Sequence, residues 1–203
     1  MANGRVITGY SKPYVALYNV SDNAVTYSEG MPLARGVSVS IDPESGDGND
    51  FYADNVTAES VGGTFTGGTL TLTVDGLKDA ARKMVMGIVT ENTVTVGTGT
   101  TSSVKVYDYD DQQVAPYVGV GFIVRYMENG VTTYVPHVIT KAVFSPEGLE
   151  AATQEEDIEF QTTELEATIM RDDSQYHRWQ RVAEAQTTEA LAEAVIRAIL
   201  GIA

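Results

Sequence analysis

The chain contains no cysteine and is poor in basic residues. Its 203 residues include 13 Lys and Arg against 28 Asp and Glu, which gives a formal net charge of −15. The lack of cysteine excludes a disulfide framework, a thiolate metal site and a cysteine nucleophile. The shortage of bases argues against a nucleic-acid-binding protein and against docking on an anionic membrane, because both need Lys and Arg at phosphate groups. A hydrophobic fraction of 43% is still enough for a folded core.

Long apolar runs are also missing. Residues 1–12 lack the apolar segment of a secretory signal, and no stretch approaches the roughly 18 uncharged apolar residues of a membrane span. The best candidate, residues 194–203, is short and contains Arg197. We therefore expect no membrane partner, and the composition predicts a soluble, acidic, β-rich globular protein.

Residue patterns typical of catalysis are scarce. The two histidines, His137 and His177, are isolated and no G-x-S-x-G motif accompanies them, so we interpret His137 as a strand residue with a satisfied side chain. The glycine-rich segment 97–103 is not followed by the lysine of a phosphate-binding loop. These observations predict that the protein is not an enzyme and needs no metal or cofactor. In an enzyme, the first candidates would be three carboxylates that turn chemistry explains better, Asp108, Asp110 and Asp111.

Alternation of apolar and polar residues predicts strands through most of the chain. Residues 14–20 and 24–27 form a short pair, and residues 33–41 and 68–74 each place their apolar side chains on one side. In the second of these, Leu70, Leu72 and Val74 alternate with threonines. A mainly β chain is therefore expected.

Two segments interrupt this pattern. Residues 42–63 are rich in Gly, Asp and Asn, and we expect a long loop that is mobile in the free subunit. Its residues 45–53 nearly match one calcium-binding nonapeptide, but no stacked copies follow and the EF-hand spacing fails, so a polar loop is the better interpretation. Residues 88–111, rich in Thr, Gly and Ser, look like an insertion of weak strands or loop.

Two helices are expected. For the first, Asp75 is the predicted N-cap and Gly87 the stop, with one apolar face made by Leu77, Ala81, Met84 and Val85. The second helix covers residues 188–200, where a narrow polar stripe is made by Glu189, Glu193 and Arg197. The remainder of this helix is apolar, so we expect it to be mostly covered.

Residues 117–144 contain the clearest hairpin, and two registers are open to it. A two-residue Asn129–Gly130 turn would place Phe122 opposite His137. A three-residue loop that includes Glu128 would pair Val124 with Tyr134 and give one coherent apolar face. We favour the three-residue loop for this reason.

A further strand is predicted over residues 157–170, with a bulge near Thr162 and Thr163 where the apolar phase slips. The opposite face is polar and mostly acidic, and consists of Glu159, Gln161, Glu164, Glu166 and Thr168. The charge is uneven along the chain as well, because residues 36–77 hold seven acids without a base and residues 142–170 hold eight. Grouping charges of one sign costs stability, so this surface either is solvated or serves to repel polyanions.

In this order, several segments resemble the major tail tube proteins of phages with long non-contractile tails. They are the YSEG turn at 27–30, FYADN at 51–55 with Glu59, FTGGTLTL at 65–72 followed by DGL at 75–77, APYVGVGF at 115–122, IEFQT at 158–162, and LE and IM at 165–166 and 169–170. The likeness spans about residues 13–200. The segment 88–111 is longer than the usual connection of the family.

The resemblance implies a single domain over residues 1–203, an antiparallel β-sandwich or barrel flanked by a helix, whose copies form stacked hexameric rings. Inner sheets would join around a channel for DNA, with inner-sheet candidates in residues 117–144 and 157–170. Residues 42–63 would reach the adjacent ring, and the candidates for this contact are Asp47, Asn49, Asp50, Phe51, Tyr52, Asp54 and Glu59. The bore-facing candidates are the polar positions of the strand at 157–170 named above.

The partners implied are further copies of the chain, a tape measure protein, tail-terminator and distal tail proteins, and DNA passing without sequence-specific binding. The expected location is the virion tail, preceded by the host cytoplasm. The alternative is an acidic β-sandwich binding module, or a related tail-terminator or head–tail connector protein.

Overall fold

A computed structural model describes residues 4–97, 102–149, 153 and 160–202, without the side chains of residues 49, 51 and 57. This part is mainly β, with antiparallel sheets and two helices, as the sequence predicts. In chain order the elements are β1 (Val6–Ser21), β2 (Ala24–Pro32), β3 (Gly36–Ser45), β4 (Asn49–Ala53), β5 (Val56–Val61), β6 (Phe65–Val74), α1 (Asp79–Met86), β7 (Thr90–Val96), β8 (Ser102–Asp108), β9 (Val118–Glu128), β10 (Val131–Phe144), β11 (Thr163–Met170), β12 (Gln180–Val182) and α2 (Glu189–Ile199).

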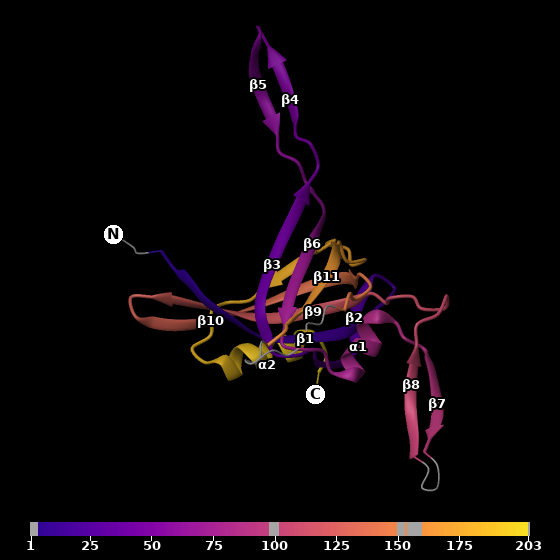
Figure 1. Cartoon of the computed structure of the whole chain (residues 1–203). Coiled ribbons are helices and arrows are strands. Elements are labelled where there is room, and N and C mark those ends of the chain that lie inside the picture. The colour runs from indigo at the N-terminus through magenta and orange to yellow at the C-terminus, as the bar shows by residue number, and fades with distance from the viewer. Residues whose placement is uncertain (1–3, 98–101, 150–152, 154–159, 203) are drawn as a thin grey trace.

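The main sheet folds over on itself to enclose the core. Its strand order is β2-β1-β9-β10-β11-β6-β3, and β12 pairs with β10 outside this path. Figure 1 shows β3 and β6 crossing steeply over β1 and β9. The core between these two halves contains, among others, Leu72 of β6, Phe122 of β9 and Ile169 of β11, and α1 contributes Ala81 and Val85. The arrangement agrees with the predicted sandwich and its flanking helix.

Helix α2 covers the opposite face of β1, β9 and β10. Its buried residues Ala192, Ile196 and Leu200 form a second core cluster with apolar residues of the strands, including Ile123 and Val138. Thr188 caps the helix, because its side chain accepts a hydrogen bond from the Leu191 backbone N–H. The predicted C-terminal helix is therefore confirmed, and the protein is layered as sheet, sheet and helix.

The polar stripe of α2 fastens the helix to β1. The Glu193 carboxylate accepts hydrogen bonds from the Lys12 ammonium and the Tyr14 hydroxyl, and the Ser11 hydroxyl donates to Glu189. Burial and this contact raise the pKa of Tyr14 to about 12, so the hydroxyl keeps its proton at neutral pH. The helix is thus held by apolar burial and by charge-assisted hydrogen bonds.

Acidification is expected to loosen this attachment. The Lys12 and Tyr14 hydrogen bonds hold the pKa of Glu193 below its usual range. A carboxyl group with a lowered pKa stabilises the fold above its ordinary pKa, and the contribution is lost as the pH falls through the lowered value. We expect this group to remove about 1 kcal/mol from the free energy of unfolding on going from neutral pH to below its lowered pKa.

Urea denaturation of the wild type and of Glu193→Gln, measured across this range, tests the expectation. The variant should show a flatter pH dependence, whereas Glu184→Gln, at an exposed position, should follow the wild type. Equal slopes for Glu193→Gln and the wild type would contradict the assignment.

Helix α1 begins later than the sequence predicts. Its N-cap is Lys78, so Asp75 and Leu77 lie before the helix, and the prediction of Asp75 as the cap is wrong. Asp75 instead accepts a hydrogen bond from the Arg35 backbone N–H and forms an ion pair with the Arg35 side chain. The side chain is therefore used to join the end of β6 to the start of β3. The predicted stop at Gly87 is confirmed, with φ of 64°.

The favoured hairpin register is wrong. Phe122 pairs with His137 and Val124 with Val135, which is the two-residue register. Asn129 and Gly130 both have positive φ, 50° and 80°, as a two-residue hairpin turn requires. The sequence argument required one apolar face, but both faces of β9 are covered, one by the core and the other by α2.

This burial limits which part of residues 117–144 could belong to a channel-facing sheet, and for Lys141–Phe144, which pairs with β11, the expectation stays a prediction. Every residue of β9 from Val118 to Val124 is buried. The buried part of the hairpin lies in the middle layer and presents no face to solvent, so it cannot line a channel.

Both segments that interrupt the pattern are hairpins: residues 42–63 were expected to form a loop, and residues 88–111 weak strands or a loop, so the strand alternative holds for the second segment. Strands β4 and β5 form one two-stranded sheet, and β7 and β8 form another. Figure 1 shows the first hairpin projecting from one end of the body and the second projecting from the opposite end. Asp54 and Asn55, at φ of 50° and 63°, make the tight turn of the first. For residues 42–63 the polar composition predicted a loop, and local strand pairing overrides it.

Candidate functional site

The outward face of β3, β6 and β11 carries a block of polar and acidic side chains. Cross-strand pairing places nine side chains in three rows of three on this face. The rows are Ser38–Thr73–Glu164, Ser40–Thr71–Glu166 and Asp42–Thr69–Thr168. Every position is a hydroxyl or a carboxylate, and none is basic or apolar.

The alternating sequence explains how this face forms. In β6 and β11 the intervening residues, such as Leu72 and Leu165, are buried in the core, so their neighbours must point outward. The Ser38 hydroxyl lies 2.8 Å from the Thr73 hydroxyl, so the outer strand is tied to the middle one by its side chains as well. The same period that fills the core therefore builds a continuous polar surface.

The face is negative without compensation. None of the ion pairs among the described residues involves Asp42, Glu164 or Glu166. Bases close to these strands are engaged elsewhere, among them Lys141 and Arg171. Lys141 Nζ lies 2.7 Å from the Asp173 carboxylate and holds the pKa of that carboxyl below its usual range, and Arg171 donates to the Phe65 carbonyl oxygen. Such a surface is well hydrated and repels polyanions.

The predicted bore-facing residues differ in where the structure places them relative to strand β11. Glu164, Glu166 and Thr168 are exposed on this face, as predicted. Strand β11 begins only at Thr163. Residues 160–162, which the prediction included in a strand starting at residue 157, therefore precede it. Gln161 is exposed but precedes the strand, and Phe160 is 90% exposed instead of sharing a strand face. Glu159 lies outside the described residues.

Sequence reasoning missed the rest of the face. The outward residues of β3 and β6 have the same alternation as β11, but only the sheet order shows that the three strands are neighbours. The available signal was the run of threonines at every second position from Thr69 to Thr73. It predicts an exposed strand face, although not which strands adjoin it.

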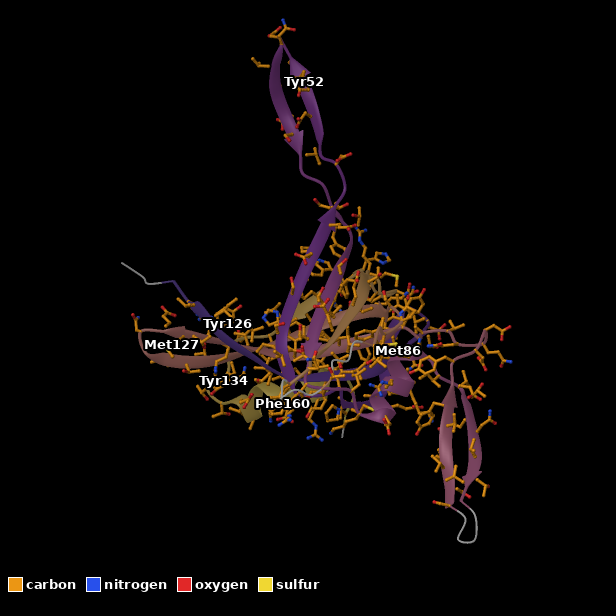
Figure 2. All side chains as sticks on the ribbon, viewed as in Figure 1. Tyr52, Met86, Tyr126, Met127, Tyr134 and Phe160 are labelled. Atoms are coloured by element: carbon orange, nitrogen blue, oxygen red, sulfur yellow. The ribbon has the colours of Figure 1, made fainter. Side chains whose placement is uncertain are left out.

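The residues predicted to contact an adjacent ring lie on or beside the β4–β5 hairpin. Asp50, Asp54 and Glu59 are exposed, and Tyr52 is 63% exposed near the far end of the hairpin (Figure 2). Asp47 is exposed in the segment that leads to it. The side chains of Asn49 and Phe51 lie outside the described residues. This hairpin is acidic, has no base, and has no strand neighbour beyond its own pair in the described chain.

His137 is only partly satisfied. Its ring stacks on Phe122 at a centroid distance of 5.5 Å, and Nδ1 lies 3.1 Å from Gln180 Nε2. Nε2 is buried and has no hydrogen-bond partner among the described residues, which corrects the prediction of a satisfied side chain. Burial lowers the pKa of His137, so the ring is neutral at physiological pH.

The three aspartates considered for enzymatic chemistry do not converge. Asp110 accepts hydrogen bonds from the Thr90 hydroxyl at 2.7 Å and from the Gln112 backbone N–H at 3.0 Å, which is turn chemistry, as predicted. Asp108 accepts from the Asn92 side chain across the β7–β8 hairpin. Within the described ranges no group of three or more His, Asp or Glu side chains could hold a metal ion.

Comparisons with known proteins add no family. No protein-family model matches this chain, and no curated protein matches it. In the part of the chain that the structure describes, neither helix is long and apolar enough to cross a membrane.

Proposed function

We propose that the protein is a structural subunit whose copies assemble into a tube for the passage of DNA, as the tail tube of a phage with a long non-contractile tail. Six copies form a ring and the rings stack. The tube contacts a tape measure protein and the tail-terminator and distal tail proteins. Its location is the virion tail, after synthesis in the host cytoplasm.

The three-row face of β3, β6 and β11 carries this proposal. DNA binds proteins mainly by exchanging its counterions for Lys and Arg side chains. A bore lined by Ser, Thr, Asp and Glu offers no such exchange, so a passing duplex keeps its counterions and does not adhere. A conduit for DNA needs this property, whereas a DNA-binding protein needs the reverse.

The free strand edges of the same half sheet support self-association. Strand β3 has no neighbour on its outer side in the described chain. At the opposite edge, β10 pairs with β11 only over Lys141–Phe144, so the start of β11 has no strand partner on that side. An open edge attracts further strands and is normally blocked or covered. Joining copies side by side covers both edges, and it makes the polar face continuous around a ring.

The β4–β5 hairpin supports stacking. A two-stranded hairpin is marginally stable when isolated in water. It projects from one end of the body and exposes Tyr52, Val56 and Val61, each more than 60% accessible. Contact with an adjacent ring would cover these apolar side chains and hold the hairpin in place.

Negative-stain electron microscopy of the concentrated chain tests the proposal. We expect rings or tubes with a central hole for the wild type. A variant in which residues 49–61 are replaced by a short Gly-Ser linker should form rings that do not stack. A wild type that stays monomeric would overturn the proposal and favour an acidic binding module, and single rings that never stack would favour a tail-terminator.

A further inference from the structure

A short segment runs along the edge of β10 before helix α2 begins. It consists of residues 179–186, includes β12, and is here called the strap. Backbone hydrogen bonds hold both of its ends to β10. At one end the Thr140 N–H donates to the Trp179 carbonyl oxygen, and at the other Tyr134, labelled in Figure 2, exchanges hydrogen bonds of 2.9 and 2.8 Å with Gln186. The strap is therefore a distinct unit attached to one strand edge.

His137 of β10 is the titratable residue that contacts the strap. It pairs with Val182, and its ring lies parallel to the Phe122 ring, with an interplanar angle of 6°. The Gln180 side-chain amide nitrogen lies 3.1 Å from Nδ1 of His137. An amide N–H can only donate, so Nδ1 accepts and the proton of the neutral ring is on Nε2. The strap thus selects one tautomer of His137.

This position accommodates a neutral ring but not a charged one. Nε2 is buried and has no hydrogen-bond partner among the described residues. A second proton must enter at Nδ1, where it meets the Gln180 amide N–H and no acceptor. A buried donor without an acceptor destabilises the state that contains it, and more so when it is charged. Protonation of His137 is therefore costly as long as the strap keeps its place.

Neighbouring charges do not compensate for this cost. A hollow of about 620 Å³ lies beside His137, and Tyr10 packs on the other side of Phe122. The charged and titratable groups that line this hollow or flank the Phe122 ring are Arg5, Tyr126, Glu184 and Tyr10. Arg5 Nε lies 3.4 Å from the Glu128 carboxylate, and Glu184 is exposed. Burial is the cause that lowers the pKa of His137, and no carboxylate among the described residues offsets it.

We propose that the strap is an acid-sensitive device, in which protonation of His137 opens residues 179–186 from β10 while the rest of the fold stays closed. Val182 and Ala185 line the hollow, so their departure lets water reach both ring nitrogens. With the strap open, His137 takes up a proton at its ordinary pKa of about 6.5, whereas with the strap closed it resists protonation to lower pH. The closed strap is therefore most stable above this pH and loses stability as the pH falls below it.

Helix α2 is attached independently of the strap. Its apolar side is buried against β1, β9 and β10, and the contacts of Glu193 hold the pKa of that carboxyl below its usual range. These contacts persist at a pH at which His137 titrates. The opening is therefore confined to the strap. Because all the groups involved belong to one copy, the inference does not depend on the proposed assembly.

Amide hydrogen exchange of the free chain tests the device. The reporters are the backbone amides of Ala183 and Gln186, which donate to carbonyl oxygens of β10. We expect their protection factors, corrected for the intrinsic pH dependence of exchange, to fall about tenfold on going from a pH of about 7.5 to about 5. The amides of residues 192–199 in α2 should keep their protection over this range.

The small number of histidines provides a matched control. The chain contains two, and His177 is exposed, so His177→Gln should respond to pH as the wild type does. Two substitutions remove the titration at residue 137 in different ways. His137→Asn keeps an acceptor for the Gln180 amide, and His137→Phe keeps a ring against Phe122. In both, the protection of the strap should be independent of pH, and circular dichroism verifies that each variant folds.

Nitrogen-15 NMR of the wild-type histidines gives a readout that needs no variant. At a pH of about 7.5 the shifts of His137 should show the tautomer with the proton on Nε2, and its protonation should follow the opening of the strap with the same midpoint. A proton on Nδ1 in the neutral ring would contradict the geometry. Strap protection that does not change with pH in the wild type, a response that survives in a folded His137 variant, or a loss that includes α2 would each overturn the proposal.

Discussion

Tubes of the double variant Glu164→Lys/Glu166→Lys are expected to retain double-stranded DNA under conditions in which wild-type tubes release it. Both carboxylates lie on the outward face of β11 and neither forms an ion pair among the described residues. In the proposed tube, the two reversals would turn an acidic patch into a basic one on every copy. Each phosphate that the new lysines neutralise releases counterions and adds about −0.9 to the slope of log K against log salt.

Fluorescence anisotropy of labelled DNA, measured from low salt to about 0.15 M, provides the test. The wild type should show no binding at the upper end of this range, and the variant should bind with a steep salt dependence. The matched control is Asp111→Lys/Glu184→Lys, which makes the same change in charge at exposed positions away from this face. Equal DNA binding by the control and the Glu164/Glu166 variant would show that net charge, and not the β11 face, decides the result.

Replacing Gly121 by valine is expected to detach α2 and to destabilise the protein by about 3 kcal/mol or more. A Cβ at Gly121 would lie 2.4 Å from Ile196 Cγ2 and 3.1 Å from Leu200 Cδ1. These atoms belong to the buried side of α2, so the helix cannot stay in place. At an open strand position a valine would instead stabilise the strand. Whether the substitution lowers or raises the free energy of unfolding therefore tests the packing.

Urea denaturation gives the loss of stability, and amide hydrogen exchange over residues 189–199 shows whether α2 is the part released. Gly148→Val is the control, because a Cβ at Gly148 meets no atom within 4 Å. It should remain within about 0.5 kcal/mol of the wild type. Equal stability of the Gly121 and Gly148 variants would show that α2 does not pack on β9 as described.

Much of the fold could be predicted from local patterns. The strand at 68–74 and the helix at 188–200 have clear periods, and both are confirmed. The hairpin turn was also encoded locally, since Asn-Gly is the typical pair for a two-residue turn. The register was nevertheless mispredicted, because the argument assumed that β9 has one buried face and one exposed face.

The candidate site was predicted only in part, and for a related reason. Glu164, Glu166 and Thr168 follow from the alternation of a single strand, whereas their neighbours on β6 and β3 come from segments about 100 residues away. Side-chain alternation shows which residues share a face of one strand. It does not show which strands pair, because pairing depends on the path of the whole chain.

The sequence by itself determined the lack of cysteine, the acidity and the alternation that separates core from exterior. Only the tertiary structure decided which of these surfaces adjoin and that β9 is enclosed between two layers. The physical reason is that periodicity arises from the geometry of a few consecutive residues. Strand order and layer packing arise from contacts between residues far apart in the chain, where many arrangements satisfy the same local pattern.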